Sequence, residues 1–222
     1  LNCMKGTFLV LGASRDQLFM IETAQAMGLH VVAIDMNPNS PGFDTADSSA
    51  CVSTRDLPGL FKLVDDLRAA GHSLCGVATM GSDIPEIVAA IAERIGTPGP
   101  SVLTARLATD KLAMKERFLE REIPIPWFEN IERFEELKRA LSERGYPAVL
   151  KPVDRSGSRG VFLLEEGCDL RALFERSIAF SHANRCLLEE YLVGPQISTE
   201  TLMFRGVGVT PGFADRNYEL LD

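Results

Sequence analysis

Short apolar runs alternate with amphipathic stretches along the first hundred residues. The runs at 7–11, 30–34 and 76–79 are mostly apolar, which is typical of strands buried on both faces of a parallel sheet. Apolar residues also recur every three or four positions, which predicts helices; the clearest sets are Leu60, Leu63, Val64 and Leu67, and Ile84, Ile87, Val88 and Ile91. Strands that alternate with helices form βαβ units. The pattern therefore predicts a Rossmann-like α/β unit over residues 1–97.

The pattern changes after residue 97. The segment Thr97-Pro98-Gly99-Pro100-Ser101 interrupts the alternation, and its glycine and prolines predict a joint between two domains. Beyond it, helices are predicted at 101–108, 110–121, 132–144 and 169–180, and strands at 147–151, 160–164, 187–192 and 198–204. Hairpins mixed with helices in this way predict an α+β second domain. Residues 205–222 are interpreted as connecting chain.

Composition places the chain among ordinary globular proteins. Its 222 residues are 45% apolar and 24% charged, and the formal net charge of −8 weighs against a general nucleic-acid binder, which needs a basic surface. No apolar run approaches the roughly 18 residues of a membrane span, so we predict no membrane partner. Five scattered cysteines without C-x-x-C spacing predict a reduced, cytoplasmic chain with neither a zinc site nor a disulfide framework.

The first candidate site is the turn Gly12-Ala13-Ser14-Arg15-Asp16-Gln17, which follows the first predicted strand. Asp35 closes the second strand, at the position where dinucleotide-binding folds place the acid that binds a ribose. The dinucleotide fingerprint needs three glycines, however, and only Gly12 is present here. We therefore interpret the segment as a tight turn without a dinucleotide. An NAD-dependent oxidoreductase that uses residues 1–97 is kept as an alternative.

The second candidate site runs from Lys151 to Gly160, where a strand ends at a lysine and a loop of small and basic residues follows. Glycine and serine allow several backbone N–H groups to converge on phosphate oxygens, and Lys151, Arg155 and Arg159 supply positive charge locally. The spacing differs from that of a P-loop, and no helix follows the loop directly, which excludes a P-loop NTPase. The segment alone leaves open a surface hairpin with basic residues.

Three further segments give this loop a context. Thr109-Asp110-Lys111 opens a predicted helix before it, and Glu189-Glu190-Tyr191-Leu192 and Gln196-Ile197-Ser198-Thr199-Glu200 follow it. In this order and spacing, the four segments resemble the ATP-grasp superfamily, which includes biotin carboxylase, the large subunit of carbamoyl-phosphate synthetase and ligases of the purine pathway. The resemblance extends from Phe8 to about Phe204.

The resemblance implies roles for residues at the phosphate end of a bound ATP. Lys111 and Lys151 match the two basic residues that hold the α- and β-phosphates. The mobile loop that closes over the triphosphate is matched by Ser156, Gly157, Ser158, Arg159 and Gly160.

The resemblance also implies roles at the adenine end. Glu189 and Glu190 match the acidic hinge, in which one carboxylate accepts a hydrogen bond from the adenine amino group. Tyr191 and Leu192 match positions whose main-chain groups meet the adenine edge. Gln196 stands where the family usually has a glutamate on the ribose hydroxyls. Its amide carbonyl still accepts a hydrogen bond, but without the negative charge.

The resemblance further implies a C-terminally incomplete chain. The matched parts are a Rossmann-like leading domain over 1–97, a first ATP-grasp lobe over 98–185 and the start of a second lobe over 186–222. The family binds Mg²⁺ on later strands, so we expect the metal ligands beyond residue 222. Asp215 and Glu219 are acidic, but neither is taken as a ligand.

The activity implied by the resemblance is an ATP-dependent ligase. ATP activates a small carboxylate as an acyl phosphate, and an amine or a similar nucleophile then displaces the phosphate. The partners implied are ATP, Mg²⁺ and a small carboxylate, and a homodimer is compatible with the sequence. Besides the oxidoreductase, a non-catalytic nucleotide-binding module is kept as an alternative, because Gln196 departs from the family pattern.

Overall fold

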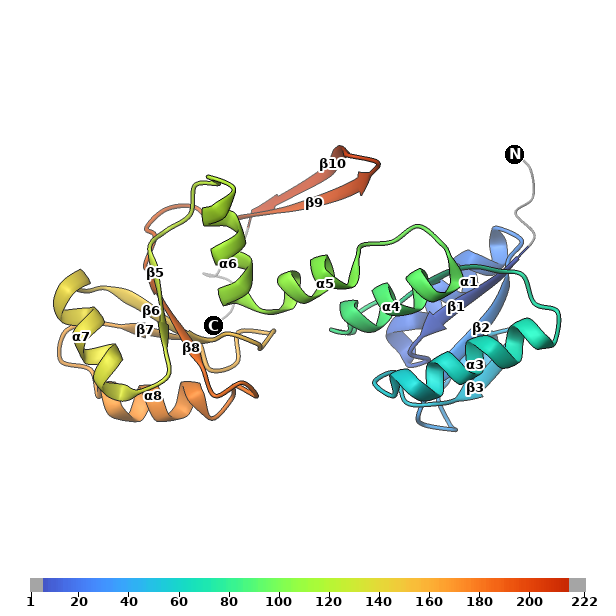
Figure 1. Ribbon diagram of the computed structural model, residues 1–222, viewed down its shortest axis with the longest axis horizontal. Coiled ribbons are helices and arrows are strands. Elements are labelled where there is room, and N and C mark those ends of the chain that lie inside the picture. The colour runs from blue at the N-terminus through green and yellow to red at the C-terminus, as the bar shows by residue number, and fades with distance from the viewer. Residues whose placement is uncertain (1–5, 216–222) are drawn as a thin grey trace.

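The computed structural model describes residues 6–215, which form two domains joined by two consecutive helices (Figure 1). The first domain contains a parallel four-stranded sheet in the order β3-β2-β1-β4. This order is that of the first half of a Rossmann fold and confirms the predicted unit. The strands are β1 (Thr7–Leu11), β2 (His30–Asp35), β3 (Ser48–Cys51) and β4 (Leu74–Ala78).

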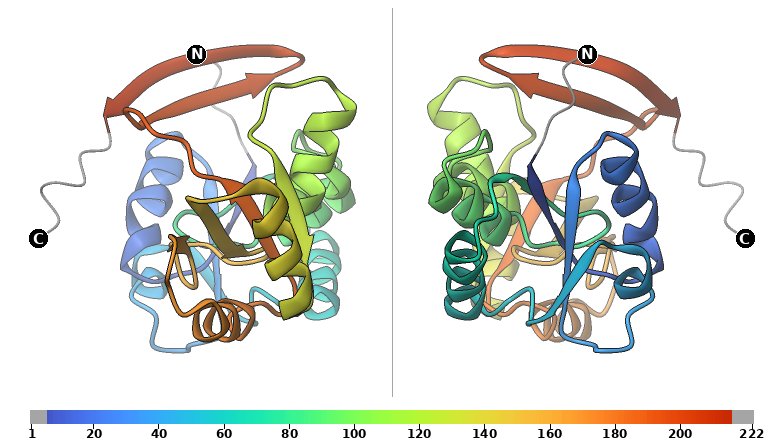
Figure 2. Two further views of the ribbon diagram at one scale, coloured as in Figure 1. Left: turned by 90° about the vertical axis from the view of Figure 1, so that its left-hand side faces the viewer. Right: turned by 90° about the vertical axis from the view of Figure 1, so that its right-hand side faces the viewer.

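Helices cover both faces of this sheet (Figure 2). They are η1 (Arg15–Gln17), α1 (Leu18–Ala26), α2 (Gly42–Thr45), α3 (Leu57–Ala69) and α4 (Pro85–Ile95). Leu9 and Leu11 of β1 face α3 and α4, where they pack with Leu60, Val64 and Ile91. Val10, between them, points to the opposite face and packs with Ile21 of α1. The alternation along β1 therefore builds two cores, one on each face of the sheet.

Two consecutive helices connect the domains. Helix α5 (Val102–Thr109) begins at Ser101, whose hydroxyl accepts a hydrogen bond from Thr104 N. Helix α6 (Lys111–Glu120) begins at Asp110, whose carboxylate accepts hydrogen bonds from Leu112 N and Ala113 N. Both caps satisfy N–H groups that a helix start leaves without partners.

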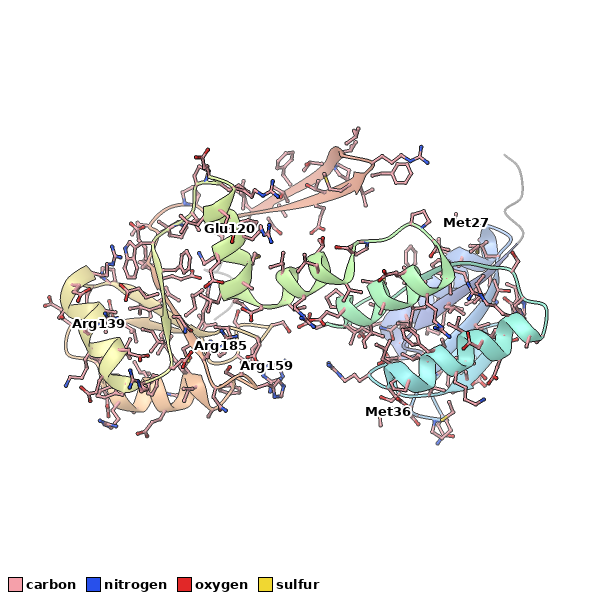
Figure 3. All side chains as sticks on the ribbon, viewed as in Figure 1. Met27, Met36, Glu120, Arg139, Arg159 and Arg185 are labelled. Carbon is pink, nitrogen blue, oxygen red and sulfur yellow. The ribbon has the colours of Figure 1, made fainter. Side chains whose placement is uncertain are left out.

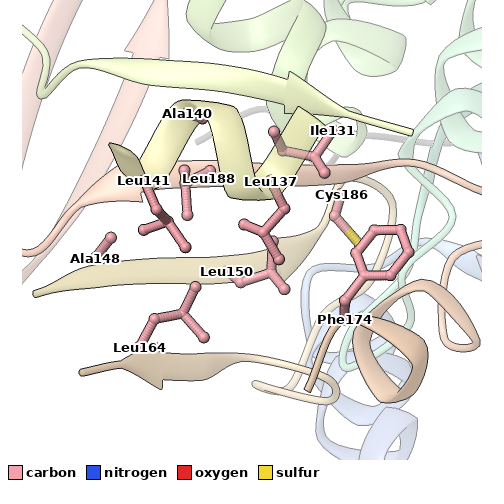
Figure 4. Packing of buried hydrophobic residues seen from close by; sticks show 10 residues of the cluster. All are labelled: Ile131, Leu137, Ala140, Leu141, Ala148, Leu150, Leu164, Phe174, Cys186 and Leu188. Atoms are coloured by element: carbon pink, nitrogen blue, oxygen red, sulfur yellow. The ribbon is translucent and has the colours of Figure 1, made fainter. Parts of the chain in front are cut away.

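The second domain contains an antiparallel sheet in the order β5-β8-β6-β7. Its strands are β5 (Phe128–Ile131), β6 (Ala148–Pro152), β7 (Phe162–Leu164) and β8 (Cys186–Glu190). One face packs against α7 (Phe134–Arg144) and α8 (Leu170–Ile178) and forms the core in Figure 4, which includes Leu137, Leu150, Phe174 and Leu188. The domain boundary predicted at residue 186 lies before β8, which pairs with β5 and β6 and so belongs to this sheet.

A separate antiparallel hairpin follows, made of β9 (Ile197–Phe204) and β10 (Val207–Asp215), and it stands apart from the other sheets (Figures 1 and 2). The prediction of connecting chain after residue 204 is wrong for 207–215, because these residues form a strand. Its alternation of valine and small residues lacks the long apolar run that we used to recognise strands. Asp215 is the last residue of β10, and Glu219 lies outside the described residues.

Candidate functional site

The face of the second sheet opposite α7 and α8 carries the charged residues singled out from the sequence. Successive side chains of a strand point to opposite faces, so Leu188 and Leu150 face the core whereas Glu189 and Lys151 face away from it. On this second face, Leu187 packs with Val153 and with Leu112 of α6. This apolar contact holds the start of α6 against the ends of β6 and β8.

Two lysines enclose one carboxylate oxygen on this face. Glu189 Oε1 lies 2.7 Å from Lys151 Nζ and 3.4 Å from Lys115 Nζ. The side chains of Lys115 and Glu189 are 8% and 10% exposed, and that of Lys151 is 21% exposed. Neither approach has the geometry of a hydrogen bond, so Oε1 is buried without a hydrogen-bond donor among residues 6–215. The two cations stabilise this carboxylate by charge, and its acceptor capacity is not used up.

Lys111 adds a third ammonium group nearby. Its backbone N donates to Val153 O at 2.8 Å, and its Nζ donates to Arg155 O, so both ends of the residue hold the loop after β6. Burial and the neighbouring charge of Lys151 lower the pKa of Lys111 below its ordinary value, although Asp83, Asp154 and Glu189 act in the opposite direction. The site therefore brings Lys111 and Lys151 close enough for their like charges to interact, and an anionic ligand between them would relieve this repulsion.

The loop between β6 and β7 has one anchored end and one open tip. Gly160 has a φ of +75°, its carbonyl accepts from Ser177 Oγ at 2.8 Å, and an added Cβ would lie 2.8 Å from Phe180 and 2.9 Å from Pro152. Gly157 and Ser158 also have positive φ values, of 69° and 57°, but an added Cβ at Gly157 meets nothing within 4 Å. The tip is therefore curved by its backbone alone and exposes its N–H groups, as an anion nest does.

The residues predicted at the adenine end separate into two groups. Glu189 is buried with the lysines, whereas Glu190 is exposed and points to the other face of β8. Tyr191 and Leu192 follow the end of β8 and are 42% and 63% exposed, and Gln196, before β9, is exposed as well. The structure thus brings Glu189 together with Lys111 and Lys151, and it leaves the other four residues at the surface after β8.

Lys115 is a site residue that the sequence analysis missed. It lies one helical turn after Lys111, so both side chains project from the same side of α6. The ammonium group of Lys115 also lies 5.6 Å from the centre of the Phe128 ring, on β5. The i, i+4 spacing of the two lysines behind a capping aspartate was a signal in the sequence that pointed to this second contact.

The turn considered for a dinucleotide is occupied by its own side chains. Asp35 accepts hydrogen bonds from Ala13 N and Asn37 N, both at 2.9 Å. The side-chain oxygen of Gln17 accepts a hydrogen bond from Ser14 N at 3.0 Å. A Cβ added at Gly12 would lie only 3.0 Å from Gln17 Cδ. Because Asp35 and the N–H groups of Ala13 and Ser14 already have partners, this geometry supports a tight turn without a dinucleotide.

The part of the chain that the structure describes holds no group of three or more His, Cys, Asp or Glu side chains arranged for a metal ion. Within the same residues, no helix is both long and apolar enough to cross a membrane.

Comparison with known proteins finds relatives along most of the chain, although no protein-family model matches it. A formate-dependent phosphoribosylglycinamide formyltransferase of Burkholderia thailandensis is 28% identical over 190 residues, covering 83% of this chain and 46% of that protein. A D-alanine–D-alanine ligase of Desulforudis audaxviator is 30% identical over 128 residues, covering 56% and 42%. The chain spans about half the length of the curated relatives it matches.

A solved structure shares the fold of almost the entire chain. The biotin carboxylase domain of the 2-oxoglutarate carboxylase of Hydrogenobacter thermophilus, in complex with MgADP, ADP and bicarbonate, has a TM-score of 0.75 and 21% sequence identity. The match covers 95% of this chain and 50% of that one. Its sequence relatives and its fold are thus similar to those of ATP-dependent carboxylate ligases, in agreement with the resemblance of its motifs to the ATP-grasp superfamily.

Proposed function

We propose that this chain supplies the nucleotide-binding part of an ATP-dependent ligase, which activates a carboxylate for attack by an amine. The observation that carries the proposal is a buried carboxylate enclosed by Lys115 and Lys151, with Lys111 nearby, beside an open loop of positive-φ residues. Phosphoryl transfer depends on positioning and on neutralisation of charge more than on covalent catalysis. Lysine cations and backbone N–H groups are the groups that this chemistry requires.

ATP fits the residues present. Lys111 and Lys151 would hold phosphate oxygens, and the N–H groups of 156–160 would close over the terminal phosphates. The buried Oε1 of Glu189 has no hydrogen-bond donor among the described residues. The amino group of a bound adenine would donate a hydrogen bond to this carboxylate. Tyr191 and Leu192 would offer main-chain groups, and Gln196 a neutral acceptor for the ribose.

When bound, Mg²⁺ supplies charge neutralisation for the phosphate oxygens. The solved biotin carboxylase domain contains MgADP, which supports the same cofactor here. The loop over the phosphates would also exclude water, which otherwise hydrolyses an acyl phosphate.

The wider setting of the protein is part of the proposal. A cytoplasmic location is supported by cysteines that are free thiols at the four described positions, Cys51, Cys75, Cys168 and Cys186. A homodimer is supported by apolar side chains exposed on and near α1, including Phe19 and Met27, around a cavity of about 340 Å³. Sedimentation at increasing protein concentration tests the dimer, and a single monomeric species throughout would reject it.

Calorimetric titration with ADP and Mg²⁺ tests the nucleotide site. We expect binding of ADP and ATP and no heat from NAD. Lys151→Ala should weaken ADP binding about tenfold to a hundredfold, because a hydrogen bond to a charged group is lost. Lys62→Ala is the matched control, since Lys62 is exposed on α3 and pairs with Asp66 at the surface. Equal ADP affinity in the Lys151 variant and the wild type would reject the site.

A further inference from the structure

A cavity of about 370 Å³ lies between the two domains, next to the loop after β6. Arg55 belongs to its wall on the side of the leading domain, and Arg155 and Arg159 belong to its wall on the side of the second domain. Arg159 lies at the edge of the second domain that faces the leading domain (Figure 3). The leading-domain wall is formed by the loops that follow β3 and β4. This is the carboxyl edge of the parallel sheet, where open α/β sheets bind their ligands.

The three arginines that line this cavity are not paired with carboxylates. In residues 6–215, none of them forms an ion pair, although eight other arginines do. Arg155 Nε donates to Phe180 O at 2.5 Å and Arg159 Nε donates to Ser156 O at 3.3 Å. These bonds are to neutral carbonyl groups, so they hold the side chains in place without neutralising them.

Three carboxylates also line the cavity, and none of them pairs with its arginines. Glu86 lies 3.7 Å from Arg106, on α5. Asp154 Oδ2 accepts a hydrogen bond from Ala183 N at 2.8 Å, and Asp154 Oδ1 is buried without a hydrogen-bond partner among the described residues. Asp83 opposes the lowering of the Lys111 pKa, so its charge acts on the phosphate side of the site. The cavity therefore offers unpaired guanidinium groups on both sides rather than a set of internal ion pairs.

The start of α4 adds to the positive potential on the leading-domain side. Ile84 is the residue before the helix, and it has no polar side chain that could accept from the first N–H groups. It lines the cavity together with Pro85 and Glu86. The N-terminus of a helix carries a partial positive charge, which favours an anion close to Arg55.

We propose that this cavity binds an acid with two anionic groups, and that Arg55 selects the second of them. The inference rests on the proposed function. The carboxylate that is activated must lie at the phosphate loop, beside Arg155 and Arg159. Arg55 stands on the opposite wall, so it meets a different part of the same small molecule. A guanidinium group binds a carboxylate or a phosphate through two parallel hydrogen bonds. The second anionic group, next to Arg55, is therefore a carboxylate or a phosphate.

Calorimetric titration of the chain saturated with ADP and Mg²⁺ tests the proposal. The probes are succinate, 3-phosphoglycerate and butyrate, which differ in the second anionic group. We expect succinate or 3-phosphoglycerate to bind at least tenfold more tightly than butyrate, and the tighter of the two identifies the second group as a carboxylate or a phosphate. Equal affinities for the three acids, or no binding of any of them, would overturn the proposal.

Two variants then locate the second group. Arg55→Gln should weaken binding of the preferred acid about tenfold to a hundredfold and leave ADP and butyrate unaffected. Arg68→Gln, on the exposed side of α3, should bind all three ligands like the wild type. Unchanged affinity for the preferred acid in Arg55→Gln would also overturn the proposal. Loss of ADP binding in the unaltered chain is a different result, because it rejects the nucleotide site and not the acid site.

Discussion

Lys115 shows how a single buried charge ties the site to the stability of the fold. Its ammonium group and that of Lys151 share Glu189, and the side chains of Lys115 and Glu189 are almost completely buried. Removal of one partner from a buried ion pair typically costs about 3–5 kcal/mol, because the other charge stays behind in a poorly hydrated place. Here Glu189 keeps its closer partner, Lys151, so the loss should be smaller.

We expect Lys115→Met to lower the free energy of unfolding by about 2 kcal/mol. This is less than the usual loss for a broken buried ion pair, because Lys151 still neutralises Glu189. Urea denaturation measures this difference. The double variant Lys115→Met and Glu189→Leu should recover part of the loss, since it removes the stranded carboxylate together with the lysine. A double variant less stable than Lys115→Met alone would show that the carboxylate is satisfied by Lys151.

Lys111 gives the free protein a characteristic dependence on pH. The folded chain lowers its pKa from the ordinary 10.5, so between the lowered pKa and 10.5 the unfolded chain binds more protons than the folded one. The contribution of this residue to the free energy of unfolding therefore rises as the pH increases from the lowered pKa to 10.5. At lower pH the protonated lysine destabilises the folded protein by a constant amount. Binding of ADP should raise the pKa of Lys111 again, because the phosphate groups stabilise the protonated lysine.

We accordingly expect Lys111→Met to raise the stability of the free protein and to remove the alkaline loss of ADP affinity. Thermal unfolding and calorimetry between pH 7 and pH 10, with and without ADP, measure the two effects separately. ADP affinity that stays constant through this range in the wild type would contradict the assignment of Lys111 to the phosphates.

At the scale of elements, the loop after β6 has one end packed against the domain and one exposed tip. Gly160 lies at the packed end and Gly157 at the tip. Gly160→Ala places a Cβ within 3 Å of Phe180 and Pro152 at a positive φ, so it should destabilise the domain by about 1–3 kcal/mol. Gly157→Ala meets no atom within 4 Å, and only its positive φ is unfavourable, at about 1 kcal/mol. Urea denaturation of the two variants compares them, and equal losses would contradict an anchored Gly160.

The loop tip should respond to the second variant in a different way. Alanine at 157 restricts the backbone that must curve around phosphate oxygens, so ADP affinity should fall more in Gly157→Ala than in Gly160→Ala, although the stability falls less. If Gly157→Ala loses more ADP affinity and Gly160→Ala loses more stability, residue 157 acts in nucleotide binding and residue 160 in folding. The same ranking in both would mean that the tip plays no part in nucleotide binding.

The elements that the sequence predicted are those with long, unambiguous apolar patterns. Strands β1, β2 and β6 and helices α3, α4 and α7 lie close to their predicted positions, because each buries a continuous stripe or run. Strand β3 was missed since Ser48-Ser49-Ala50-Cys51 is a polar edge strand, and β5 was missed since its four residues follow prolines. Trp127, just before β5, packs against the core of the second domain, beside Arg144.

The candidate site was predictable only where a pattern of residue types implied a shared location. Lys111, Lys151 and Glu189 come together because α6, β6 and β8 present them on one side of the sheet, and their roles toward a nucleotide stay predictions. Local sequence could not show that Glu189 is buried with the lysines and Glu190 exposed, since that depends on which face of β8 meets α7 and α8. The contribution of Arg55 to a cavity beside Arg159 is likewise set by the contact between domains.

At the scale of the whole molecule, the two domains have separate hydrophobic cores. The clusters of the leading domain and those of the second domain share no residue among those described. Domains with independent cores unfold as separate units when few contacts connect them. We therefore expect two transitions in differential scanning calorimetry of the chain.

ADP should raise the temperature of one transition only, that of the second domain, because a ligand stabilises the unit that binds it. The dicarboxylate or phosphorylated acid that contacts both walls of the interdomain cavity should instead bring the two transitions closer together. Lys151→Ala abolishes the first shift and Arg55→Gln the second. A single transition that ADP moves as a whole would show that the domains unfold together.

Helix α5 makes the angular relationship between the domains depend on the number of its residues. It spans eight residues from Val102 to Thr109, it packs against α4 across the connecting residues 96–101, and it continues into α6 through Asp110. Each residue of an α-helix turns the chain by about 100° and advances it by about 1.5 Å. Insertion of one alanine into α5 would therefore swing Arg55 away from Arg159 while leaving the ADP site intact. Substitutions within α5 that keep its eight residues should therefore preserve the cavity between the domains, whereas insertions and deletions should not.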